Sequence, residues 1–350
     1  MGSHRNALVA VVRHELAEAR GTARAVLAAA ESARGQAQQR RRLVRDAYAT
    51  CLNQLTEARD VARFEVLRRF RAEAAQLACT AAALADRSAS GAASAPWRMW
   101  APTEPGAGGH GGLLRVGTVA FESVTVPALV PLLDAAHVQL DGERTAVDGV
   151  ISGLLLRALG STRPGDLRLT VYDPEALGGT LAAFAPLENA GLVSFVGPGG
   201  VGAMLDELVE HICRVNETVL AGGYVSMTEL TSASTGPRPE PWRVVVLLAG
   251  PAGAAELTSA QRSQLDRIVR TGVASGVHLV VRGLDLVPHP TVERITVHDR
   301  AATCDTTGAL PVRLDPGPPA ERVAGFCRSM AERLCAPEVI IPYEVNSDHT

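Results

Sequence analysis

The sequence predicts an α/β fold in which helices cover both faces of a mostly parallel sheet, preceded by a long helical segment. From about residue 113 onward, apolar strand-like runs alternate with helix-like stretches, a pattern typical of parallel sheets with helical crossovers. Residues 6–87 contain no proline and are rich in Ala, Leu, Arg, Glu and Gln, which are good helix formers.

Composition indicates a globular protein rather than a secreted or membrane-spanning one. The chain has 350 residues, of which 47% are hydrophobic and 20% charged, enough for one sizeable core and an accessory element. The six cysteines are scattered, with no C-x-x-C pair, which argues against a disulfide framework or a zinc site. No apolar run reaches the roughly 18 residues of a membrane span. We therefore expect a cytoplasmic protein.

The helical segment, residues 1–87, carries apolar residues at three-to-four spacing, as in Leu8, Val12 and Leu16 and again in Val44 and Tyr48. Such a seam requires a partner helix. We expect either a coiled coil, which would make the protein a homo-oligomer or join it to a partner protein, or an antiparallel hairpin. A hairpin would turn at the polar stretch of residues 35–42.

Charge is distributed unevenly along the chain. Residues 1–87 hold 15 Arg and 9 acidic residues, a net charge of +6, whereas residues 88–350 carry −9. A basic cluster in the helical segment is a candidate for weak DNA contacts, although a solvated basic turn is the favoured explanation. Its members are Arg40, Arg41, Arg42 and Arg45.

Residues 88–112 are rich in Pro, Gly and Ser and predict a linker. Two tryptophans, Trp97 and Trp100, are unusual in such a segment, and we expect them to dock it onto the α/β domain. We place that domain at residues 113–340 and a tail at residues 341–350.

Strands and helices then alternate along the domain. Strands are predicted at residues 113–122, 137–140, 167–172, 191–196, 242–248, 277–282 and 293–298. Helices are predicted at residues 147–159, 202–220, 259–275 and 320–334. The near-continuous apolar strands VVVLL and VHLVV predict a parallel sheet covered on both faces.

In order and spacing these elements resemble the ATPase module of the FtsK/SpoIIIE-type DNA translocases, in the HerA/FtsK branch of RecA-like motors. The most specific stretch is LRLTVYDPEALGGTLAAF, residues 167–184, with an aspartate-proline step at the end of a strand. RVVVLLAGPAG, residues 243–253, occupies the Walker B strand, and GVHLVVRGLDL, residues 276–286, resembles the strand after it. The resemblance implies a RecA-like P-loop NTPase fold.

The catalytic positions depart from the family pattern. The loop at residues 141–148 stands where the resemblance places Walker A, yet Val147 replaces the lysine and Asp148 the magnesium-binding hydroxyl. Gly142 and Thr145 belong to the same degenerate loop, and the chain contains no lysine. At the Walker B acids stand Ala249 and Gly250. Asp173 and Glu175 offer a relocated acidic pair, but in the family this strand end has a structural role.

A second glycine-rich turn suggests a different nucleotide. Gly197, Gly199 and Gly202 satisfy G-x-G-x-x-G after a strand and before a helix, which is the context of a dinucleotide fingerprint. The next clear strand begins only at Trp242, and no acidic residue ends a strand about 20 residues on. A turn that starts a helix is the favoured explanation of the motif.

These observations predict a non-catalytic FtsK/SpoIIIE-like module, a pseudo-ATPase that acts as an assembly or adaptor subunit for a DNA-translocase-type ATPase. It would need no cofactor or metal. Two alternatives stay open. One is a protein that binds nucleotide or DNA in a changed mode, with ATP and Mg²⁺ as ligands. The other is a dinucleotide-binding enzyme that uses the turn at residues 197–202.

Overall fold

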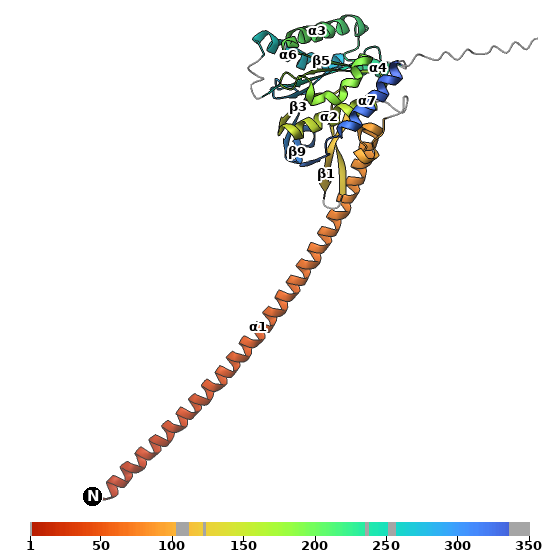
Figure 1. Cartoon of the computed structure of the whole chain (residues 1–350). Coiled ribbons are helices and arrows are strands. Elements are labelled where there is room, and N and C mark those ends of the chain that lie inside the picture. Colours follow the sequence, from red (N-terminus) through yellow and green to blue (C-terminus); the bar gives the residue numbers. More distant parts are fainter. Residues whose placement is uncertain (1, 103–111, 122–123, 235–237, 251–256, 336–350) are drawn as a thin grey trace, which may run out of the picture. The chain divides into compact units, whose positions relative to one another are not determined.

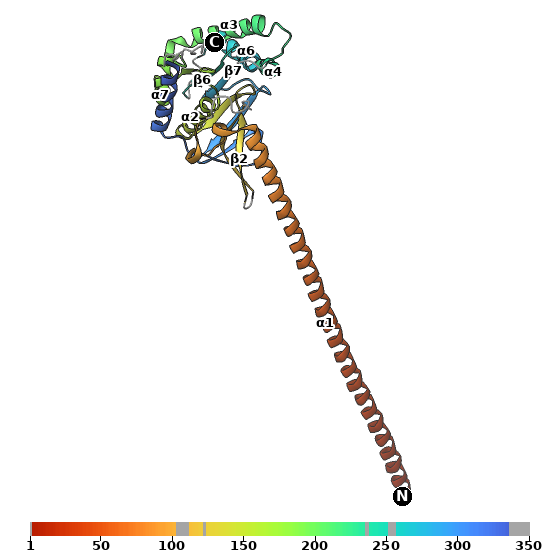
Figure 2. The ribbon, with the colours of Figure 1, turned by 90° about the vertical axis from the view of Figure 1, so that its right-hand side faces the viewer.

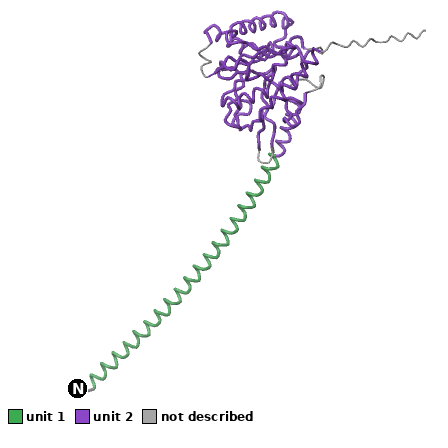
Figure 3. Tube along the Cα trace, viewed as in Figure 1, with its two compact units in different colours: residues 1–74 green, residues 75–350 purple. Residues whose placement is uncertain are grey.

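The computed structural model describes residues 2–102, 112–121, 124–234, 238–250 and 257–335 (Figure 1). The chain divides into two compact units, residues 1–74 and residues 75–350 (Figure 3). The predicted tail, residues 341–350, lies outside the described residues.

Helix α1 (Gly2–Ser88) is one continuous helix of 87 residues. The alternative of an antiparallel hairpin that turns at residues 35–42 is therefore wrong. Gln and Arg are good helix formers, and a single glycine such as Gly35 costs a helix only about 1 kcal/mol. Between residues 3 and 73 every side chain is exposed except Ala30. Within the described part of the chain, the apolar seam of this helix is uncovered.

The second unit is built on one ten-stranded sheet, in the order β2-β1-β10-β9-β8-β3-β7-β6-β4-β5. The six strands from β8 to β5 are parallel, and the other four extend the sheet in antiparallel fashion. The strands are β1 (Leu113–Phe121), β2 (Val124–Pro131), β3 (His137–Gly142), β4 (Leu167–Tyr172), β5 (Val193–Val196), β6 (Trp242–Leu248), β7 (Val277–Arg282), β8 (Val292–His298), β9 (Ala301–Cys304) and β10 (Val312–Leu314). Sequence patterns do not predict β2, β9 and β10.

Helices cover both faces of the parallel strands (Figure 2). On β6 the buried side chains alternate, since Val244 and Val246 belong to one apolar core and Val245 and Leu247 to the other. Helices α2 (Arg144–Ser161) and α7 (Ala320–Cys335) contribute to the first core, and α3 (Val201–Arg214) and α6 (Ser259–Thr271) to the second. The predicted three-layer α/β arrangement is confirmed.

Two segments that the sequence left unassigned are helical. Residues Gly179–Ala190 form a 3₁₀ segment that packs against α7, and α4 (Met227–Ala233) is a short helix capped by Ser226. Both lie in connections between parallel strands. No helix in the described part of the chain is long and apolar enough to cross a membrane.

The linker docks onto the α/β core as predicted. Trp97 donates its indole N–H to the carbonyl of Pro316 at 2.7 Å, and the Trp100 ring meets Phe326 edge-on with centroids 5.3 Å apart. Trp97 and Trp100 also lie against Gly153 and Gly160 of α2, where a larger residue would crowd the rings. The described part of the linker is thus fixed to the helix that follows β3.

Candidate functional site

The carboxyl ends of β3, β4, β6 and β7 meet at one edge of the sheet, where ligands bind in open α/β folds. A pocket of about 300 Å³ lies there. It is lined by Leu140, Asp141, Gly142, Arg144, Glu175, Ala249, Gly250, Arg282 and Gly283. The two positions aligned with Walker A and Walker B are thus brought together, although more than 100 residues separate them.

The connection from β3 to α2 is much shorter than the expected loop at residues 141–148. Strand β3 ends at Gly142 and α2 begins at Arg144. Thr145, Val147 and Asp148 therefore lie in the helix, and Val147 is fully buried in the core. A side chain at position 147 does not reach the pocket that a Walker lysine would serve.

The start of α2 is capped by a carboxylate of the chain itself. Glu143 accepts hydrogen bonds from the backbone N–H groups of Thr145 and Ala146, at 2.9 and 2.8 Å. These bonds hold the pKa of the Glu143 carboxyl below its usual range. Free N–H groups at a helix start are what bind phosphate in nucleotide sites. Here two of them are already satisfied by a negative group.

Gly142 is required by the backbone. Its φ is +135°, and a Cβ at this position would collide with the backbone oxygen of Val297 on the neighbouring strand β8. This glycine therefore permits a close approach between strands.

An ion pair lies in the wall of the pocket, and a second, longer one joins it to α2. Arg144 Nη1 lies 2.6 Å from Glu175 Oε2, and Arg144 Nε lies 3.8 Å from Asp148 Oδ2. Glu175 comes from the connection after β4 and lies directly against Gly250, where a Cβ would collide with its carboxylate. The predicted Walker B position thus faces a carboxylate that an arginine holds.

Arg282 is more buried than Arg144, and only part of its guanidinium group has a partner. Its Nε is 3.3 Å from Asp148 Oδ1, close enough for an ion pair, but the angles do not make a hydrogen bond. Its Nη2 is buried without a hydrogen-bond partner. Burial raises the pKa of the Asp148 carboxyl above its usual range, with Arg282 acting in the opposite direction.

The acidic pair Asp173 and Glu175 does not form a shared site. Asp173 is buried and accepts hydrogen bonds from the backbone N–H groups of Ala176 and Thr180, each at 3.2 Å. Glu175 instead pairs with Arg144. The described residues contain no group of three or more His, Cys, Asp or Glu that could hold a metal ion.

The glycine-rich turn at residues 197–202 lies at the far end of the sheet. It forms a short 3₁₀ turn, Pro198–Gly200, that leads into α3. A Cβ at Gly197 or Gly199 would have no atom within 4 Å, whereas a Cβ at Gly202 would lie 3.1 Å from Gln261 Nε2. The chain then crosses to β6, which is separated from β5 by β4. The turn therefore lacks the adjacent second strand of a dinucleotide fold.

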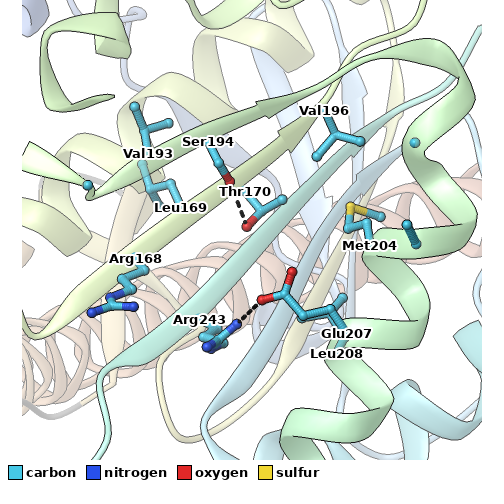
Figure 4. Close-up of a pocket in the computed structure, with 13 residues that line it drawn as sticks. Arg168, Leu169, Thr170, Val193, Ser194, Val196, Met204, Glu207, Leu208 and Arg243 are labelled. Carbon is cyan, nitrogen blue, oxygen red and sulfur yellow. Dashed lines mark hydrogen bonds and ion pairs between the residues drawn. The ribbon is translucent and has the colours of Figure 1, made fainter. Parts of the chain in front are cut away.

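A second hollow, of about 440 Å³, lies between α3 and the strands β4, β5 and β6 (Figure 4). Ser194 donates to Thr170 across β5 and β4 at 3.3 Å, and Arg243 pairs with Glu207 of α3 at 2.9 Å. Arg168 of β4 also lines it. These residues belong to no recognisable motif, so sequence reasoning missed this hollow.

The basic cluster lies in the continuous part of α1 rather than at a hairpin tip. Arg40, Arg41, Arg42 and Arg45 are all exposed. The consecutive Arg40, Arg41 and Arg42 point in different directions around the helix, whereas Arg45 lies on the same side as Arg41 and Arg42.

A scan against protein-family models finds no match, and a search of curated proteins finds none. Among solved structures, the chain is similar to EssC (ATPases 2 and 3) from Geobacillus thermodenitrificans, with 13% identity and a TM-score of 0.51. The match covers 67% of this chain and 51% of that one, so this chain spans about half the length of the EssC structure.

Two further matches have lower TM-scores. EccC (ATPases 2 and 3) from Thermomonospora curvata, in complex with a signal sequence peptide, is 16% identical to this chain, with a TM-score of 0.47. The match covers 64% of this chain and 47% of the EccC chain. The pCW3 conjugation coupling protein TcpA is 12% identical, with a TM-score of 0.48, and the match covers 69% of this chain and 75% of the TcpA chain. The similarity to EssC confirms the FtsK/SpoIIIE-type ATPase fold predicted from the sequence.

Proposed function

We propose that this chain is a non-hydrolysing FtsK/SpoIIIE-like module that acts as an assembly or adaptor subunit for an active ATPase of that type. The observation that carries the proposal is the capping of α2 by Glu143, whose carboxylate bonds the N–H groups of Thr145 and Ala146. A nucleotide phosphate would have to displace this carboxylate and would meet Glu175 and Asp148 behind it.

Hydrolysis also needs groups that the described residues of this pocket lack. ATPases of this kind stabilise the transferring phosphoryl group with a lysine and with Mg²⁺ held by a hydroxyl and an acidic residue. Val147 is buried, Asp148 is tied to two arginines, and Ala249 and Gly250 supply no carboxylate. Each such electrostatic contact contributes several kcal/mol to transition-state stabilisation. Without any of these contacts the transition state of ATP hydrolysis is not stabilised, so we expect no hydrolysis.

An assembly role is supported by helix α1. Its apolar side chains are exposed over most of its length, and exposed apolar seams of this kind bind partner helices. The chain also matches about half of an EssC structure that holds two ATPases, which favours a role beside a second, active module.

Thermal unfolding and hydrolysis assays test the proposal. We expect no release of phosphate from ATP. We also expect no change in melting temperature with millimolar Mg²⁺ATP, millimolar NAD or micromolar DNA. A ligand present at 100 times its Kd would stabilise the folded state by about 2.7 kcal/mol, a shift that such a melt detects. A magnesium-dependent shift with ATP would overturn the proposal, and a shift with NAD alone would favour the turn at Gly197.

Arg282 favours one second candidate, a protein that binds an anionic nucleotide in a changed mode. Its Nη2 is buried beside the pocket without a hydrogen-bond partner, and buried guanidinium nitrogens are seldom left unmatched. In that mode ATP would stabilise the protein without Mg²⁺, and Arg282→Ala would abolish the stabilisation. No shift with ATP in the presence of EDTA excludes this candidate.

A further inference from the structure

One face of α1 repeats every 11 residues. Val44, Leu55, Val66 and Leu77 form a row with this spacing, and all four are exposed. An 11-residue repeat corresponds to about 3.67 residues per turn, so the row stays on one side of a nearly straight helix. A partner helix can therefore follow it over its whole length.

The residues that flank this row are arranged symmetrically about Val66. Ala62 lies four residues before Val66 and Phe70 four residues after it, so a small and a large side chain stand at equal distances from Val66. Arg59 lies seven residues before Val66 and Glu73 seven residues after it, so a positive and a negative side chain also stand at equal distances from Val66. Offsets of four and seven residues both fall beside the row on an α-helix.

We propose that α1 pairs with α1 of a second copy of this chain, antiparallel and centred on Val66. In this register Arg59 of each copy meets Glu73 of the other, and Phe70 packs against Ala62. Further out, Leu55 meets Leu77 of the second copy. Each contact occurs twice, as in any isologous two-fold interface.

Charge decides the orientation and the identity of the partner. Arg63 and Arg69, three residues either side of Val66, meet like charges in either orientation, so they do not decide it. Arg59 and Glu73 do, because in a parallel, in-register pair Arg59 would face Arg59 and Glu73 would face Glu73, and like charges in contact at an interface are unfavourable. In the single chain Arg59 forms an ion pair with its neighbour Asp60, and both side chains are more than half exposed. Such an exposed ion pair contributes little to stability, so Arg59 can leave Asp60 to pair with Glu73 of a second copy. The symmetry about one residue is what a second copy of the same helix requires.

Sedimentation of the full-length protein with charge-reversal variants tests this inference. We expect a dimer for the unmodified chain. Arg59→Glu and Glu73→Arg should each raise the dimer dissociation constant about tenfold or more, because each places two like charges in contact. The double variant, and an equimolar mixture of the two single variants, should return to nearly the original value.

Arg68→Glu is the matched control, because position 68 lies two residues after Val66 and hence on the opposite side of the helix; it should leave the dissociation constant unchanged. Circular dichroism confirms that every variant keeps its helix. A monomeric unmodified chain, or a double variant as weak as the single ones, overturns the inference. This pairing rests on the assembly role proposed above. Sedimentation measures dimer formation without nucleotide, so a monomeric chain would overturn the pairing alone, whereas ATP hydrolysis would overturn the proposed function.

Discussion

Arg157 is fully buried, and its Nη2 donates a hydrogen bond to Oδ2 of Asp315 at 3.0 Å. The same guanidinium donates to the carbonyls of Ala92 and Ala95 and lies 4.1 Å from the centre of the Trp97 ring. Burial lowers the pKa of Arg157 to about 10, although Asp315 acts to raise it. One buried cation on α2 therefore holds the linker and the segment after β10 together.

We expect Asp315→Ala to lower the free energy of unfolding by roughly 3–5 kcal/mol, because it leaves a buried guanidinium without its counter-charge. Urea unfolding measures this change. Glu207→Ala is the control, since the pair of Glu207 with Arg243 is largely exposed on the Glu207 side, and its loss should cost about 1 kcal/mol or less. Equal effects of the two variants would contradict the structural role of the buried pair.

Restoring the Walker lysine should fail. Val147 is fully buried in the core on α2, so Val147→Lys places an ammonium group in an apolar environment. Burying a charge without a partner costs several kcal/mol or more, and we expect a lower melting temperature and no ATP binding. Val147→Met, which fills similar space without charge, is the control. A Val147→Lys protein that is stable and binds ATP would show that position 147 reaches the pocket.

The two glycine positions of interest should respond differently to alanine. Gly142→Ala collides with the Val297 backbone and requires a φ that alanine rarely adopts, so we expect a loss of about 2–4 kcal/mol of stability. Gly197 has a φ of −68° and open space around it, so Gly197→Ala should change the stability by less than about 0.5 kcal/mol. Chemical denaturation of both variants compares them. Similar losses would show that the turn at residue 197 is more constrained than its geometry indicates.

His137 should make the protein sensitive to acid. It is buried, accepts a hydrogen bond from the Leu279 N–H and donates one to the Val269 carbonyl. Burial, assisted by the nearby His278, lowers the pKa of His137 to about 3. An unfolded histidine has a pKa near 6.5. Between about pH 6.5 and pH 3 the unfolded state therefore binds more protons, and the free energy of unfolding falls as the pH falls.

The contribution of one such histidine is at most about 1.4 kcal/mol per pH unit. Urea unfolding at pH 7, 6 and 5 measures the slope, and His137→Gln should reduce it by up to this amount. The exposed His298 offers His298→Gln as the control, which should keep the slope. An unchanged slope in His137→Gln would mean that other groups govern the acid response.

DNA binding should be weak, sensitive to salt and confined to α1. The helical segment, residues 1–87, carries +6, and residues 88–350 carry −9, so only the former attracts phosphates. Fluorescence titration at 50 and 200 mM salt measures the affinity. Replacing Arg40, Arg41 and Arg42 together by alanine should reduce the slope of log K against log salt by about 2–3, whereas Arg168→Ala should not. Tight binding that persists at 200 mM salt would contradict this expectation.

Local periodicity in the sequence was enough to predict part of the fold. The proline-free stretch predicted α1, and near-continuous apolar runs predicted the parallel strands β6 and β7, because burial on both faces removes the need for polar residues. The tryptophans of the linker predicted its docking, since two large apolar rings are seldom left in water. The sequence also predicts two degenerate nucleotide positions, where the lysine and the carboxylates of the family pattern are replaced by other residues.

The contacts within the site depend on the tertiary structure. Glu143 became a helix cap because α2 begins at Arg144, three residues earlier than the predicted start at Val147. The partner of Arg144 is Glu175, 31 residues away, and that of Arg157 is Asp315, 158 residues away. Such pairs leave no periodic signal in the sequence, because they depend on which strands lie side by side. The same is true of the short antiparallel strands β9 and β10, which form by pairing with neighbours rather than by their own propensity.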